Sequence, residues 1–290
     1  MKEIINKHQK KLLAILILIL TAGGFLFYFL NHKNALEPLK NLSLFNISAI
    51  LILYGAILLA LTYVLKCSLE LFEKKIVFHE NLQLNIWSNI VNFFGPLQSG
   101  PGVRAIYLKK KHSLDIKKFL YISLIYYGFI ALISCLFIAL GSFNIFLAIL
   151  TMILAAWVIY SGFKILSSKI GKSDKPHLNP KIISKLLIVT LIQLFITSII
   201  YLIELHIVNQ SIDYHQVLTY TGVANLALFV SITPGAIGFR ESFLLFTQKL
   251  HHISASNVLS ASLIDRSLYL VFLLILIVFA ASMHLKKRLS

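Results

Sequence analysis

The stretch FLYISLIYYGFIALISCLFIALGSFNIFLAILTMILAAWVIYSGF, from Phe119 to Phe163, decides the fold class because it contains no Asp, Glu, Lys, Arg or His. As one α-helix it would extend about 67 Å, roughly twice the hydrocarbon core of a bilayer. The chain must therefore fold back on itself within this stretch, and we place the turn at GSFN (Gly141 to Asn144). Two adjacent membrane-spanning helices predict an all-α polytopic membrane protein.

The overall composition also excludes an ordinary soluble domain. Of the 290 residues, 58% are hydrophobic and 13% are charged, whereas a soluble domain carries about 25% charged residues. The formal charge of +16 is distributed in the way that membrane topology requires, so we expect no nucleic-acid partner. Cys67 and Cys135 show no spacing typical of metal ligands, and we expect no metal and no cofactor.

Six apolar segments are long enough to cross the bilayer, near 12–30, 45–66, 118–141, 143–165, 182–206 and 257–284. Two further segments, 80–108 and 216–250, are apolar but interrupted by Pro and Gly. The basic connections and both basic termini lie on one side only if each interrupted segment leaves the membrane on the side where it entered. We therefore predict two re-entrant helical hairpins, with both termini in the cytoplasm and the protein in a prokaryotic cytoplasmic (inner) membrane.

The two interrupted segments contain similar motifs. NFFGPLQSGPGVRA (Asn92 to Ala105) and ITPGAIGFRE (Ile232 to Glu241) each read Pro, a glycine-containing spacer, then Gly, an apolar residue and Arg. The positive-inside topology makes the first hairpin enter from the cytoplasm and the second from the opposite side. This arrangement is typical of an inverted repeat, here about 45–141 and about 182–284 within a single membrane domain that covers 1–290.

Charged residues near the breaks form the candidate site, because charge inside a bilayer is costly. The half-helices after the breaks would direct backbone N–H groups toward the membrane interior, and guanidinium groups bind phosphate in a bidentate manner. Asp265 and Arg266 lie about 13 Å into the last span, near the midplane. We therefore expect a site for the phosphate of an anionic lipid, with substrate-binding residues Asn92, Gly102, Arg104, Pro234, Gly235, Gly238, Arg240, Glu241, Asp265 and Arg266.

A structural interpretation of the same charges stays open. Glu241 with Arg266, or Asp265 with Arg240, would form buried ion pairs that only hold helices together. Under the binding interpretation, the two carboxylates hold the arginines in place without a ligand or accept protons during transport. Glu204, near the end of the fifth span, is interpreted as an interfacial residue.

These motifs resemble the lysylphosphatidylglycerol synthase transmembrane (flippase-like) family over most of the chain. The resemblance rests on Asn92…Pro96…Gly102-Val103-Arg104-Ala105, on PGAIGFRE (Pro234 to Glu241) and on Arg266. It implies a lipid-handling membrane domain, which in two-domain members moves an aminoacylated phospholipid between leaflets while a separate soluble domain makes that lipid.

Three features depart from the family's pattern. The chain ends at Ser290, just after the last span, so we expect no soluble catalytic domain and do not carry over lysyl-lipid synthesis. Ala236 stands where the family usually has a second glycine, and Tyr126-Tyr127 stands where the first repeat often has a Glu-Arg pair. These differences leave the first half with fewer buried charges than the second.

The expected function is flippase-like binding and translocation of an anionic lipid, either a phospholipid or a polyprenyl phosphate, between leaflets. One alternative is a membrane-embedded transferase or glycosyltransferase that uses a lipid-phosphate donor, for which the external loops offer only Glu37 and Asp213 as acids. Another is a structural subunit of an envelope-synthesis complex. We assign no catalytic residue, and the expected partners are anionic membrane lipids, a second copy of the chain or an envelope-synthesis protein.

Overall fold

The computed structural model describes residues 42–95, 99–142, 179–230 and 234–289, together with Lys40 and scattered positions between 146 and 164. Every regular element within these ranges is a helix. Four helices are long and apolar enough to cross a membrane: α2 (Leu44–Glu70), α5 (Ile116–Ser142), α7 (Pro180–Val208) and the Ala255–Ser282 part of α11 (Ala255–Leu289). They match four predicted spans. The predicted spans at 12–30 and 143–165 lie outside the described residues, apart from scattered helical positions in the second.

Local sequence explains where α2 and α7 begin. The Ser43 hydroxyl accepts a hydrogen bond from the backbone N–H of Asn46 at 3.1 Å, and the Asn179 side chain accepts one from Lys181 at 3.0 Å. Each cap satisfies an N–H group that the helix itself leaves unpaired, and Pro180 at the first position of α7 has none to satisfy. Both helices therefore start at a defined residue.

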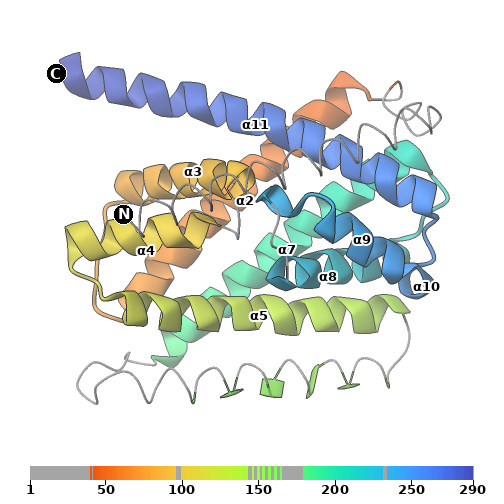
Figure 1. The fold of residues 1–290 in the computed structure, drawn as a ribbon, viewed down its shortest axis with the longest axis horizontal. Helices are drawn as coiled ribbons and strands as arrows, with labels where there is room; N and C mark the ends of the chain where they lie inside the picture. Colours follow the sequence, from red (N-terminus) through yellow and green to blue (C-terminus); the bar gives the residue numbers. More distant parts are fainter. Residues whose placement is uncertain are drawn as a thin grey trace, which may run out of the picture.

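The long helices frame two groups of shorter ones (Figure 1). α2 and α7 pack against each other and cross the centre of the view, while α5 runs along its lower part and α11 along its upper part. The shorter helices are α3 (Phe78–Phe94), α4 (Ser99–His112), α8 (Tyr214–Val230), η3 (Pro234–Ala236), α9 (Phe239–Phe246) and α10 (Gln248–His251). α3 packs against α4, and α8 packs against α9.

The shorter helices of one half pack on the long helices of the other half. α8 packs against α5, and α3 contacts both α11 and η3. α3 and α8 have 17 residues each, so each extends about 26 Å, less than the ~30 Å of a hydrocarbon core. The two interrupted segments are thereby brought together between the long helices.

The break in the second half requires unusual backbone conformations. Gly235 and Gly238 have φ angles of 57° and 79°, in the left-handed region that glycine adopts without strain. Ala236 adopts the same region with a φ of 58°, although a Cβ makes this conformation costly. The sequence PGAIG therefore forms a sharp turn before α9.

The break in the first half is built differently from the expectation. α4 already begins at Ser99, so Gly102 lies in its first turn and not in the break itself. Gly95 and Gly100 are the closely packed glycines of this break. A Cβ on Gly95 would lie 2.6 Å from the carbonyl oxygen of Val91, and one on Gly100 would lie 2.7 Å from that of Ser88. The Ser88 hydroxyl donates to the Gly100 carbonyl at 2.7 Å, and the Asn92 side chain accepts from the Gly100 N–H at 3.2 Å.

Candidate functional site

A buried ion pair connects α9 to α11. One terminal nitrogen of Arg240 donates to Oδ2 of Asp265 at 2.6 Å, and the other donates to the hydroxyl of Tyr201 at 3.1 Å. Arg240 is 5% exposed and Asp265 is 7% exposed. A pair this deeply buried makes each partner depend on the other, because removing one leaves an uncompensated charge.

Glu241 interacts with both arginines and with the start of α9. Its Oε2 accepts a hydrogen bond from the Gly238 N–H at 2.7 Å, as in a capping box. Its Oε1 lies 3.4 Å from a terminal nitrogen of Arg266 and 3.5 Å from one of Arg240. The Glu241 carboxylate therefore occupies the positively charged end of α9, and an entering anion would compete with it.

Tyr54 and Glu204 complete this cluster, although the sequence analysis did not assign them to the site. The Tyr54 hydroxyl lies 2.7 Å from Oδ1 of Asp265 and 3.4 Å from Oε1 of Glu204. Glu204 is 1% exposed, so its carboxyl group lies inside the helix bundle and not on the protein surface. A signal was present, because Tyr201 and Glu204 are three residues apart and so share one face of α7.

A cavity of about 220 Å³ lies beside the cluster. It brings together residues from both breaks: Asn92 and Phe93 from the first, Gly235 and Ala236 from the second. The remaining lining residues are Tyr54, Ile57, Leu228, Arg240, Asp265, Arg266 and Tyr269. Since pockets for drug-sized ligands measure about 300–1,000 Å³, this cavity has room only for a smaller group.

Half of the predicted site residues line this cavity: Asn92, Gly235, Arg240, Asp265 and Arg266. Two others, Gly238 and Glu241, support it through the capped start of α9. Pro234 begins η3, and Gly102 is exposed on α4.

Arg104 lies apart from the other arginines. It lines a separate recess of about 20 Å³ together with Ser123, Tyr126 and Tyr127. One terminal nitrogen is 3.5 Å from the side-chain oxygen of Asn85, and its buried Nε has no partner. No carboxylate of the described residues lies within 4.0 Å of its guanidinium. Among the described residues, Arg104 therefore has no ion-pair partner, and it lies beside the Tyr126-Tyr127 dipeptide.

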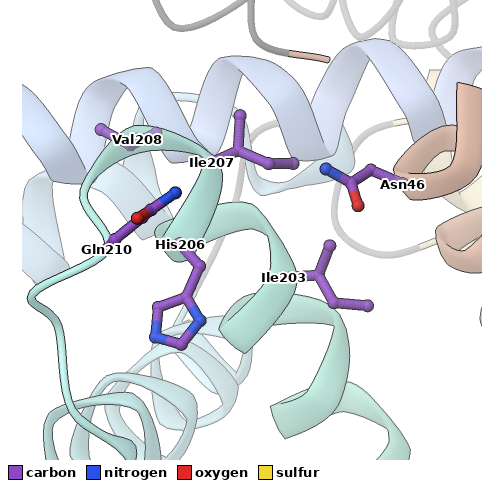
Figure 2. A pocket seen from close by; sticks show the side chains of 6 residues that line it. All are labelled: Asn46, Ile203, His206, Ile207, Val208 and Gln210. Atoms are coloured by element: carbon purple, nitrogen blue, oxygen red, sulfur yellow. The ribbon is translucent and has the colours of Figure 1, made fainter. Parts of the chain in front are cut away.

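A larger cavity of about 670 Å³ lies between the start of α2 and the end of α7 (Figure 2). Its described lining comprises Asn46, Ile203, His206, Ile207, Val208 and Gln210. None of these is an acid, a lysine or an arginine. Nor do the described parts of the chain contain three His, Cys, Asp or Glu residues placed to hold a metal ion. We therefore place the candidate site at the charged cavity.

The fold and this cavity define a polytopic helical membrane protein with a buried charged site. The sequence model of the lysylphosphatidylglycerol synthase TM region matches residues 11–277. The chain belongs to this family, which confirms the resemblance found in its motifs and makes it a lipid-related membrane protein. A comparison with curated proteins finds no match.

Proposed function

We propose that the chain is a flippase-like protein that binds the phosphate of an anionic lipid and moves its headgroup between the leaflets of a prokaryotic cytoplasmic membrane. The lipid is a phospholipid or a polyprenyl phosphate. The observation that carries this proposal is that residues of both breaks line the same cavity as Arg240 and Arg266. Ion pairs that served only to hold helices together would need no such cavity.

Arg266 is the residue best placed to receive the phosphate. Its side chain is 17% exposed, compared with 6% for Arg240. Its contact with Glu241 is long at 3.4 Å, and its Nε has no partner. Arg240 is held by Asp265 and Tyr201, so it supplies positive charge without having to move. Phosphate binding would therefore exchange the weak Arg266–Glu241 contact for a bidentate one.

We infer that α3–α4 and α8–α9 are re-entrant hairpins in the two halves of an inverted repeat, with both termini in the cytoplasm. The lengths of α3 and α8, each below that of a full span, support this inference. So does the packing of each hairpin on the last long helix of the opposite half. In this arrangement a headgroup at the cavity lies between two irregular backbone segments, where transporters of inverted-repeat architecture bind their substrates.

Lipid binding measured by native mass spectrometry tests the proposal. Wild-type protein in detergent is mixed either with phosphatidylglycerol or with diacylglycerol, which lacks the phosphate. The protein is then released from the detergent in the mass spectrometer, and the lipid adducts that remain are measured. We expect the wild type to form adducts with phosphatidylglycerol only. The Arg266→Gln variant should bind phosphatidylglycerol about tenfold more weakly or worse, since a charge-assisted bidentate contact contributes about 1.5–3 kcal/mol. Lys249→Gln, at an exposed position of α10, is the matched control and should bind as the wild type does. Equal adducts with both lipids would contradict the proposal.

A further inference from the structure

Glu204 is a buried carboxyl group with no cation of its own. It is 1% exposed, and among the described residues its carboxyl group has a polar contact with the Tyr54 hydroxyl at 3.4 Å. Within the described residues, no nitrogen of a Lys, Arg or His side chain lies within 4.0 Å of it. A lone ionised carboxylate is very costly at such a position, and a carboxyl group there avoids the cost by binding a proton.

The neighbouring charges leave nothing to neutralise Glu204. The groups that face it are Tyr54 from α2, Tyr201 from its own helix, Tyr220 from α8, Arg240 from α9, and Asp265 and Arg266 from α11. Arg240 is paired with Asp265, and Arg266 with Glu241. These two positive and two negative charges already balance, so a third carboxylate would give the cluster a net negative charge.

The hydrogen bonding of Tyr54 points to the same protonation state. Its single hydroxyl hydrogen has carboxylate oxygens on two sides, Asp265 at 2.7 Å and Glu204 at 3.4 Å. One hydrogen cannot serve both acceptors. The ring is fixed against Tyr269, at 5.2 Å between centroids, and against Phe272 at 5.6 Å. A proton on Glu204 resolves the conflict, because Glu204 then donates to Tyr54 while Tyr54 donates to Asp265.

We propose that Glu204 is the proton-binding site of this protein and that its proton strengthens the binding of the anionic lipid. This inference rests on the proposed function. The proton comes from water and forms an O–H bond on the Glu204 carboxylate. It is present at neutral pH without lipid and returns to water as the pH rises, which happens at a lower pH when the cavity holds no lipid. With Glu204 neutral, a phosphate in the cavity meets two arginines. With Glu204 ionised, the same phosphate meets an additional negative charge, which favours its release.

Infrared spectroscopy of the purified full-length protein tests the proton site without any lipid. We expect a C=O stretch of a protonated carboxyl group at neutral pH, and Glu204→Gln should remove it. Asp213→Asn, which neutralises an exposed carboxylate, is the matched control and should leave it in place. If Glu204→Gln does not fold, Tyr54→Phe should keep the band and shift its frequency, because the proton loses its acceptor. A wild-type spectrum without this band, or a band that neither variant changes, would overturn the proposal.

The affinity for phosphatidylglycerol as a function of pH tests the coupling. Wild-type affinity should fall by about tenfold or more between about pH 5 and pH 9, since proton and anion binding are reciprocally linked. Glu204→Gln should bind phosphatidylglycerol with the same affinity across this range. Phosphatidylglycerol binding by the wild type that does not change with pH would refute the coupling and leave the proposed function standing. Absence of binding at every pH would instead contradict the proposed function.

Discussion

Gly100 is a position where one added methyl group should damage the packing of the first break. A Cβ there would lie 2.7 Å from the Ser88 carbonyl oxygen and 2.9 Å from the Cβ of Asn92. We expect Gly100→Ala to lower the free energy of unfolding by about 1–3 kcal/mol, as overpacking of a tight contact does. Thermal unfolding in detergent measures the effect.

Gly102→Ala is the control for this prediction, because a Cβ on Gly102 would meet nothing within 4 Å. It should be neutral or stabilising by up to about 1 kcal/mol, since alanine favours a helix over glycine. If Gly102→Ala proves the more damaging of the two, the description of this break is wrong.

Under the proposed function, Glu241 would compete with the lipid for the arginines, and two substitutions separate its roles. Glu241→Gln keeps a side chain that can accept the Gly238 N–H but removes the charge that faces Arg266. We expect it to bind phosphatidylglycerol several-fold more tightly than the wild type does, because Arg266 is then unpaired. Glu241→Ala also loses the helix cap and should be less stable by about 1 kcal/mol.

Native mass spectrometry and thermal unfolding of both variants give the two readouts. Weaker lipid binding by a folded Glu241→Gln protein would show that Glu241 assists the ligand and does not compete with it.

At the scale of elements, Glu80 ties the start of α3 to the end of α4. Its Oε1 lies 2.7 Å from the Tyr107 hydroxyl, 2.9 Å from Nζ of Lys111 and 2.7 Å from Nε2 of His112. Burial alone would raise the pKa of Glu80, but the hydrogen bonds from these three side chains outweigh it and lower the pKa to about 2. The ionised form of Glu80 therefore stabilises the contact between α3 and α4.

The pH dependence of stability should report this contact. Because the pKa of Glu80 is lower in the folded protein, its contribution is complete above the unfolded value of about 4.3. The contribution is lost as the pH falls toward the folded value of about 2. At pH 7 we expect the wild type to have a higher melting temperature than the Glu80→Gln variant. The two melting temperatures should converge as the pH is lowered. A difference that stays constant with pH would contradict the assignment.

The sequence predicts the long helices and the breaks better than the contacts around them. The four long helices end close to the ends of the predicted spans, because length and apolarity alone determine a span. These helices are α2, α5, α7 and the spanning part of α11. The Pro and Gly residues likewise marked both breaks.

Tertiary packing determined the rest. Gly102 has open space around it, whereas Gly100 is closely packed because Ser88 of α3 lies against it. The burial of Glu204 depends on Tyr54, which is 150 residues away in the chain. No local pattern reveals such a distant neighbour. The spacing of Tyr201 and Glu204 only indicated that both lie on one face of α7.

At the scale of the whole molecule, the proposed inverted repeat predicts on which side of the membrane each connection lies. Labelling of single cysteines in membrane vesicles with an impermeant thiol reagent measures this, and the two native cysteines, Cys67 and Cys135, are buried. Lys75→Cys and Lys110→Cys should react only from the cytoplasmic side, because they flank the first hairpin. Gln210→Cys and His252→Cys flank the second and should react only from the opposite side.

All four positions are exposed, so a lack of reaction from one side reports the membrane and not burial. If Gln210→Cys and His252→Cys were labelled from opposite sides, the second interrupted segment would cross the bilayer, and the repeat would not be inverted.

Translocation of a labelled anionic lipid tests the central claim most directly. Purified protein is reconstituted into phosphatidylcholine vesicles containing fluorescent phosphatidylglycerol, and dithionite is added to quench the label in the outer leaflet. Vesicles with wild-type protein or with Lys249→Gln should lose fluorescence from both leaflets. Vesicles with Arg266→Gln should keep the inner-leaflet signal, as protein-free vesicles do, although the variant remains folded. Equal loss of fluorescence with wild type and folded Arg266→Gln, or no loss beyond protein-free vesicles with the wild type, would contradict the claim that this cavity carries the lipid headgroup.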